Sequence, residues 1–265
     1  MSRRDADAVH RCPTDRRAGR SGGHGGDAAH VVLVHGVGLD GSSFTGLATD
    51  LRRVGLVPTI VDRRGYDDRP PCGDLDVHVA DLVAVLAGLD GCDGDVTVVG
   101  VSGGATLVLA LALAGHHRLG RVVVHEPLLG PAAAEQHRNV TGAISSLGAT
   151  PTAAAVTRFL RTLVTPTTWD GLDEAIRVRA VGRAATIAVE APGFAAFAIE
   201  PDRLGRSPTP ITWTVGRSSP AWRHRAAAVA RDHGVAVVEI DGAHTPQLEN
   251  AARYAATIAP AGARR

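Results

Sequence analysis

The sequence predicts an α/β fold, with a mostly parallel, doubly wound sheet covered by helices. Short apolar runs rich in β-branched residues recur along the chain, and a segment of helical length separates most of them, which is the pattern of βαβ units. This alternation stops over residues 130–207. A stretch of that length is too long for a loop and predicts a helical insertion over one end of the sheet.

The composition is that of a folded domain. Hydrophobic residues make up 45% and charged residues 21% of the 265-residue chain, as in globular proteins. The formal net charge of +1 indicates neither a nucleic-acid nor a membrane partner. The longest apolar run falls short of the ~18 residues of a membrane span. Three cysteines without paired spacing give no zinc or disulfide pattern. We therefore expect a cytoplasmic protein without metal or cofactor.

The N-terminal stretch differs from the rest. Residues 1–28 are polar, rich in arginine and glycine, and aperiodic. No apolar segment follows the arginine pairs, as a secretory signal would require. We expect a disordered extension over residues 1–28 and a folded domain over residues 29–265.

The periodicity of apolar residues places the elements of that domain. Continuous β-branched runs are typical of parallel strands buried on both faces. Strands are expected over residues 30–34, 56–61, 96–100, 121–125, 211–215 and 235–240, and helices over 44–54, 76–89, 105–114, 221–232 and 248–258. The insertion is alanine-rich, and helix breaks are expected at Pro151, Pro166, Pro192 and Pro201.

The junction between the third strand and its helix carries the clearest motif. Gly100-Val101-Ser102-Gly103-Gly104 fits the Gly-X-Ser-X-Gly nucleophile elbow. Residues two before and two after the serine must be nearly free of side chain so that strand and helix can pass closely. The tight turn leaves the hydroxyl exposed at a helix N-terminus, where backbone N–H groups stabilise a developing anion. The motif predicts a nucleophilic serine.

A second glycine motif supports a different function. Residues 36–41 fit Gly-X-Gly-X-X-Gly, and Asp62 ends the next strand, where a ribose-binding acid would be expected. His35 and the polar turn that follows suit a nucleotide pocket poorly. A dinucleotide fold also leaves Ser102 and His244 unexplained. An NAD(P)-binding Rossmann protein is therefore an alternative of lower rank.

Four motifs in order resemble those of the α/β-hydrolase superfamily, over residues 30–258. They are His35-Gly36 after the first strand, the Asp62-Arg63-Arg64-Gly65-Tyr66 turn after the second, the Ser102 elbow, and His244 in the turn after the last strand. The resemblance implies an α/β-hydrolase fold with the insertion as its lid or cap.

The resemblance also assigns roles to particular residues. It implies Ser102 as nucleophile and His244 as the base that takes its proton. The backbone N–H groups of Val37 and Gly103 are the implied oxyanion hole. His35 is interpreted as a residue that braces the loop.

The chain departs from the family at the triad acid. The family usually places an acid after the next-to-last strand, where this chain has Ser219, and a hydroxyl cannot stabilise an imidazolium. Glu126, directly after the strand over 121–125, resembles the glutamate of certain haloalkane dehalogenases and is the predicted acid. Asp202 and Asp241 are alternatives.

Together these residues predict a serine hydrolase that cleaves an ester, thioester or lactone of a small or apolar substrate through an acyl-enzyme. Two other classes stay open, because one fold supports many functions. One is a non-catalytic ligand-binding or sensor protein, suggested by Ser219. The other is a cofactor-free enzyme of non-hydrolytic chemistry, such as peroxidation, C–C cleavage or a lyase step. The expected partner is a small-molecule substrate.

Overall fold

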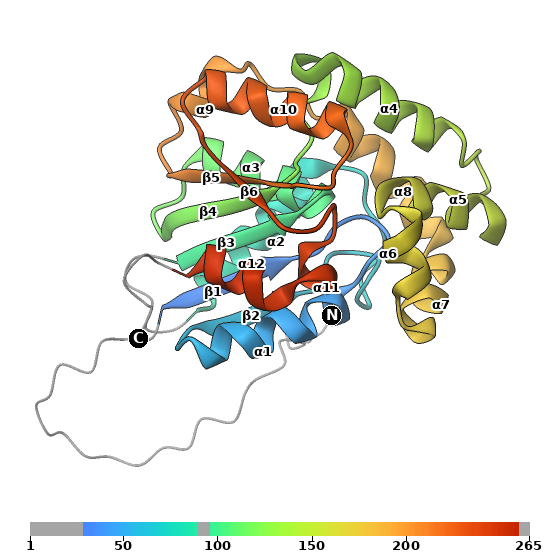
Figure 1. Cartoon of the computed structure of the whole chain (residues 1–265), viewed down its shortest axis with the longest axis horizontal. Helices are drawn as coiled ribbons and strands as arrows, with labels where there is room; N and C mark the ends of the chain where they lie inside the picture. The colour runs from blue at the N-terminus through green and yellow to red at the C-terminus, as the bar shows by residue number, and fades with distance from the viewer. Residues whose placement is uncertain (1–28, 90–95, 260–265) are drawn as a thin grey trace, which may run out of the picture.

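Parallel strands form one sheet in the order β2-β1-β3-β4-β5-β6 (Figure 1). The computed structural model describes residues 29–89 and 96–259; the extension expected over residues 1–28 lies outside them. The strands of this part are β1 (His30–Val34), β2 (Val57–Val61), β3 (Val96–Val101), β4 (Leu119–His125), β5 (Ile211–Gly216) and β6 (Ala236–Ile240). The predicted parallel α/β sheet is confirmed.

Helices cover both faces of the sheet, which explains why the inner strands β1 and β3 are buried and almost continuously apolar. On β1, Val31 and Leu33 face one cluster of buried side chains, and Val32 and Val34 face the other. The first cluster is completed by α1 (Thr45–Arg53) and α12 (Ala251–Ile258). The second is completed by α2 (Leu75–Ala87), α3 (Gly103–Ala114) and α10 (Ala221–Asp232).

The strand order changes direction at β1. The chain passes from β1 to β2 on one side and then to β3 on the other. Open α/β sheets bind ligands in the crevice at the carboxyl ends of the strands beside such a switch. Residues that follow β1 and β3 therefore lie where a site is expected.

The helix expected over residues 44–54 is α1, which follows a 3₁₀ turn, η1 (Gly41–Phe44). The last expected helix is divided in the structure into α11 (Pro246–Glu249) and α12. Asn250 separates the two parts: its non-helical backbone ends α11, and its side chain accepts a hydrogen bond from the Arg253 N–H as the N-cap of α12.

The insertion is helical throughout its regular structure. It contains η2 (Gly130–Ala133), α4 (Ala134–Ser145), α5 (Ala153–Leu163), α6 (Pro166–Gly171), α7 (Glu174–Gly182), α8 (Ala184–Ala196) and α9 (Asp202–Gly205). Figure 1 shows α5 to α8 grouped beyond one end of the sheet. Across the described residues, every helix is too short or too polar to cross a lipid bilayer.

The expected break at Pro192 is wrong, because Pro192 lies inside α8. A proline within a helix removes one backbone hydrogen bond and crowds the preceding turn. Here the helix continues because Ile187, Ala191 and Phe194 are all buried, with exposed fractions of 2% or less. Tertiary packing thus outweighs the local preference.

Candidate active site

Ser102 lies on a strained turn between β3 and α3. Its φ is 56°, in the left-handed region, and its N–H donates to the His125 carbonyl at 2.9 Å. A Cβ added to Gly100 would lie 2.5 Å from the Gly104 carbonyl oxygen and 2.6 Å from Ala105 Cα. The turn therefore requires glycine at Gly100, as the elbow motif predicts.

The loop after β1 packs directly against this elbow. A Cβ on Gly36 would be 3.0 Å from Ser102 Cβ, and a Cβ on Gly103 would be 2.9 Å from Val37 Cγ2. Val37, Ser102 and Gly103 line one cavity. The structure thus brings the two predicted oxyanion donors next to the predicted nucleophile.

His35 holds the loop after β1 in place through hydrogen bonds at both ring nitrogens. Its Nε2 accepts the Arg63 N–H at 3.1 Å, and its Nδ1 donates to the Gly36 carbonyl at 2.9 Å. Burial and the neighbouring Arg63 guanidinium hold the pKa of His35 well below its usual value. The ring is therefore neutral and serves as a fixed hydrogen-bonding spacer.

A buried charged network joins the same loop to the insertion. The Gly38 N–H donates to the Tyr66 hydroxyl at 2.6 Å, and that hydroxyl donates to Glu190 on α8. Arg63 Nη1 also donates to Glu190, at 2.5 Å, and its Nη2 donates to the Gly36 carbonyl at 3.0 Å. Glu190 was missed by sequence reasoning. The available signal is a glutamate within an otherwise apolar helix.

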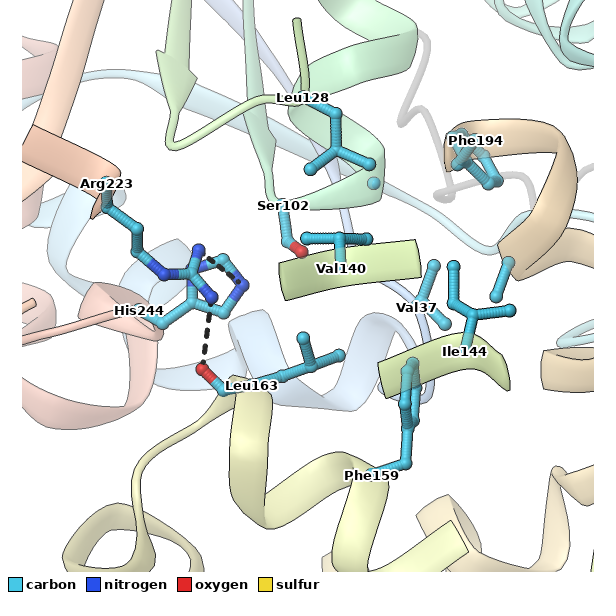
Figure 2. Close-up of a pocket in the computed structure, with 12 residues that line it drawn as sticks. Val37, Ser102, Leu128, Val140, Ile144, Phe159, Leu163, Phe194, Arg223 and His244 are labelled. Atoms are coloured by element: carbon cyan, nitrogen blue, oxygen red, sulfur yellow. Dashed lines mark hydrogen bonds between the residues drawn. The ribbon is translucent and has the colours of Figure 1, made fainter. Parts of the chain in front are cut away.

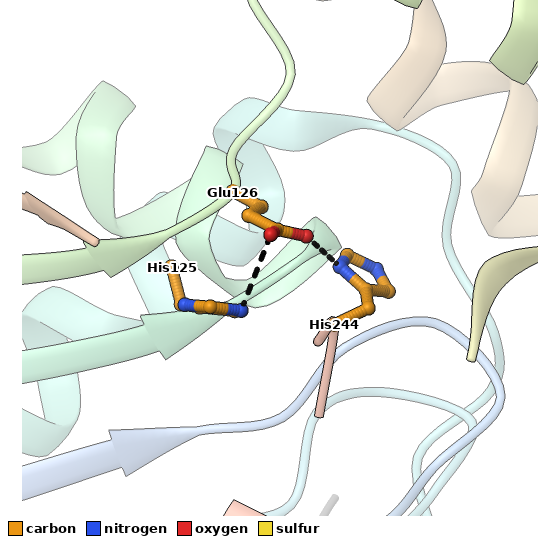
Figure 3. A group of neighbouring side chains, drawn as sticks. All are labelled: His125, Glu126 and His244. Atoms are coloured by element: carbon orange, nitrogen blue, oxygen red, sulfur yellow. Dashed lines mark hydrogen bonds and ion pairs between the residues drawn. The ribbon is translucent and has the colours of Figure 1, made fainter. Parts of the chain in front are cut away.

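Glu126 and His244 meet at the carboxyl ends of the strands. Glu126 follows β4 with φ 51°, and its Oε2 lies 2.6 Å from His244 Nδ1 (Figure 3). Its Oε1 accepts the Gly216 N–H at 2.9 Å and the Ser219 hydroxyl. The serine at the family's acid position is therefore a hydrogen-bond donor to the carboxylate that faces the histidine.

The alternative acids lie elsewhere. The Asp241 carboxylate is 54% exposed and pairs with Arg217, whereas Asp202 is 68% exposed and pairs with Arg206. Neither contacts His244 in the hydrogen bonds of the described chain. Of the three candidates, Glu126 is the one that the structure places against the ring.

The protonation states of this pair follow from its surroundings. Burial alone raises the pKa of the Glu126 carboxyl, but Arg223, His125 and His244 lower it by more, so its pKa lies below the usual value. Burial and the Arg223 charge lower the pKa of His244 to about 3, against the opposing effect of Glu126. At neutral pH the ring is neutral, with Nδ1–H donating to Glu126 and a lone pair on Nε2.

Arg223, at the start of α10, was not anticipated. Its Nη1 donates to Glu126 Oε2 at 2.8 Å, lies 3.2 Å from His244 Nε2 and also contacts His244 Nδ1. Within the described residues no hydrogen bond links Ser102 Oγ to His244. The local sequence shows only an arginine on a helix, four residues after Ser219.

Two cavities meet at Val37, Ser102, Leu163 and His244. Figure 2 shows the first, whose walls come from the strand ends and from α4, α5 and α8. Its apolar lining residues are Val37, Leu128, Val140, Ile144, Phe159, Leu163, Ala191 and Phe194. The insertion therefore contributes much of the wall around Ser102.

The potential ligand atoms of His125, Glu126 and His244 lie within 4.8 Å of one another, close enough to surround a metal ion. His125 Nε2 faces the Ala243 carbonyl at 3.0 Å, and its Nδ1 faces the Thr214 hydroxyl at 3.0 Å. Both ring nitrogens of His125 thus have hydrogen-bond partners. The Arg223 cation occupies the space beside the other two groups. The cluster is a hydrogen-bonded network and suits a metal ion poorly.

The glycine loop over residues 36–41 also fits a dinucleotide poorly. The Gly41 N–H donates to Asp62 Oδ1 at 2.7 Å, and the Ser42 N–H donates to Asp40 Oδ1 at 3.1 Å. A pyrophosphate needs such N–H groups free at the helix start. Here two carboxylates hold them and would repel the phosphate charge.

Comparison with known proteins agrees with this fold. Solved structures that share the fold include the enol-lactonase from Burkholderia xenovorans LB400 (20% identity, TM-score 0.62, covering 89% of this chain and 92% of that one). They also include MenH from S. aureus (16% identity, TM-score 0.68, covering 87% of this chain and 91% of that one). A third is naproxen esterase from Bacillus subtilis (18% identity, TM-score 0.65, covering 88% of this chain and 83% of that one). No curated protein matches this chain in sequence. Residues 31–257 match the family model described as "Alpha/beta hydrolase family". The chain, with its elbow at Ser102 and its parallel sheet, belongs to the alpha/beta hydrolase family.

Proposed function

We propose that this protein is a serine hydrolase that cleaves an ester, thioester or lactone through an acyl-enzyme. The observation that carries the proposal is the 2.6 Å contact between Glu126 Oε2 and His244 Nδ1, beside a serine on a strained turn. A carboxylate in this position holds the imidazole in the tautomer that leaves Nε2 free to accept a proton.

The reaction has two halves. Ser102 Oγ attacks the carbonyl carbon while His244 Nε2 takes the hydroxyl proton, and the tetrahedral adduct then expels the leaving alcohol, thiol or ring oxygen, which receives that proton. Water, deprotonated by the same nitrogen, attacks the acyl-enzyme and releases the acid and Ser102. Each half leaves His244 neutral again, so no other reactant is consumed.

Backbone donors stabilise the charge that forms on the carbonyl oxygen. The Val37 and Gly103 N–H groups adjoin Ser102, and the N-terminus of α3 adds its dipole. The buried links from Tyr66 and Arg63 to the loop support the orientation of Val37. In this proposal the insertion over residues 130–207 acts as the cap, and its apolar side chains select a small or apolar acyl group.

A fluorophosphonate probe tests the proposal directly. We expect one label per chain, mapped to Ser102, no label in Ser102→Ala, and labelling slowed at least about 100-fold in His244→Ala. Ser146→Ala, which removes an exposed serine on the insertion, should label like wild type. Absence of labelling in the folded wild-type protein would contradict the proposal and favour the ligand-binding alternative.

A further inference from the structure

Arg223 places a permanent positive charge in the wall of an apolar cavity. Its side chain is 3% exposed and lines the cavity together with Ser102 and His244 (Figure 2). Among the described lining residues it is the one side chain with a fixed charge. Arginine is rarely buried without a function or full pairing.

The donors of Arg223 are incompletely used. Nη1 reaches Glu126 at 2.8 Å, whereas Nη2 reaches only the Leu163 carbonyl, at 3.4 Å, beyond the usual length of such a bond. Nε has no hydrogen-bond partner among the described residues. A buried donor without a partner costs about 1–3 kcal/mol. On the edge of the guanidinium formed by Nε and Nη2, Nε therefore lacks an acceptor and Nη2 has only the long contact with the Leu163 carbonyl.

Glu126 does not supply that acceptor, because its oxygens are committed elsewhere. Oε1 accepts from the Gly216 N–H and the Ser219 hydroxyl, and Oε2 is shared between His244 and Arg223 Nη1. The Nε and Nη2 edge of a guanidinium matches the two oxygens of a carboxylate in a bidentate pair.

We propose that Arg223 binds a carboxylate carried by the substrate, so that the preferred substrates are short acyl compounds with a negative charge near the scissile carbonyl. The proposal names the substrate class of the Ser102 site and so rests on the proposed function. The linker is short because Nη1 lies only 3.2 Å from His244 Nε2, the atom that must reach Ser102.

Calorimetric titration of glutarate and butyrate tests the proposal without turnover. Both acids offer one carboxylate to the oxyanion loop, and glutarate alone offers a second to Arg223. We expect wild type to bind glutarate at least about tenfold more tightly than butyrate. Arg223→Met should abolish the difference, and Arg223→Lys should retain part of it. Arg225→Met, which removes an exposed arginine paired with Glu135, should leave the difference unchanged.

Equal affinity of the two acids for wild type, or a preference that survives in Arg223→Met, would overturn the proposal. If Arg223→Met fails to fold, the wild-type comparison and the lysine variant still decide it. Fluorophosphonate labelling separates the two proposals: labelling of Ser102 without a glutarate preference refutes only the carboxylate site. A glutarate preference in folded protein that resists labelling refutes only the hydrolase.

Discussion

The Glu126 carboxylate and the His244 imidazole approach to 2.6 Å although 118 residues separate them in the chain. The parallel pairing of β4, β5 and β6 brings them together, because the carboxyl ends of neighbouring parallel strands share one edge of the sheet. This edge also holds the turn of Ser102. The predictions below concern how these groups act on one another.

Glu126→Gln should lower kcat/KM by about 10²–10⁴-fold, because a neutral amide neither fixes the tautomer of His244 nor stabilises its cation. The change also leaves Arg223 buried without its carboxylate, so stability should fall by about 3–5 kcal/mol. Hydrolysis should be assayed well below the melting temperature of the variant. Glu135→Gln, at an exposed glutamate, is the control. A loss under about tenfold would contradict the role of Glu126.

An acid at position 219 should restore part of the activity that Glu126→Gln loses. Because the Ser219 hydroxyl donates to Glu126 Oε1, the carboxylate of an aspartate at position 219 would lie close to the space that the Glu126 carboxylate occupies. We expect Ser219→Asp in the Glu126→Gln background to recover at least about tenfold in kcat/KM. Ser218→Asp in that background, at the exposed neighbouring serine, should recover nothing. Equal kcat/KM values for the two double variants would show that a side chain at position 219 does not reach His244.

The acid limb of the pH–rate profile should lie far below neutrality. Activity needs neutral His244, whose pKa is lowered to about 3 by burial and by Arg223. As pH falls through 6, the ring stays neutral and the rate of Ser102 labelling should persist. Removing the Arg223 charge lets the pKa rise, so Arg223→Met should move the limb to higher pH, while Arg225→Met leaves it in place. A wild-type limb near pH 6.5 would contradict this assignment.

Tyr66→Phe should reduce kcat by about tenfold with little change in KM, because the hydroxyl that accepts the Gly38 N–H is lost and the oxyanion loop is held less firmly. Stability should fall by about 1–3 kcal/mol, since that N–H and Glu190 lose a buried partner. Steady-state kinetics and denaturant unfolding measure both effects. Tyr254→Phe, at a buried tyrosine of the α1–α12 side, is the matched control. An effect confined to KM would indicate a substrate contact.

Gly100→Ala should destabilise the fold by about 1–3 kcal/mol or more, because the new methyl would lie 2.6 Å from Ala105 Cα. Gly142→Ala provides the contrast: it lies within α4, and a Cβ there meets nothing within 4 Å. It should stabilise by about 0.5–1 kcal/mol through helix propensity. Urea unfolding of both variants measures the difference. Similar stabilities would refute the close approach of strand and helix at the elbow.

Much of the fold could be predicted because its signals are local. The strand at Val96 is apolar on both faces, and the glycines beside Ser102 mark a turn that tolerates no side chain. The helix division at Asn250 was missed, since capping by one side chain is a weak signal in an apolar periodic pattern. The helix break predicted at Pro192 is wrong for the opposite reason. The local effect of proline is strong, but the packing of its buried neighbours outweighs it.

The sequence by itself determined the family resemblance and the order in which Ser102, Glu126 and His244 follow their strands, because strand periodicity and glycine turns are written within a few residues. The tertiary structure decided which of three acids faces His244, and it brought Arg223 and Glu190 into buried contacts. In the local sequence, each of those two residues is an ordinary charged residue on a helix. Their partners lie 97 and 127 residues away, on loops that follow strands, and such long-range pairing cannot be recognised in a short stretch of sequence.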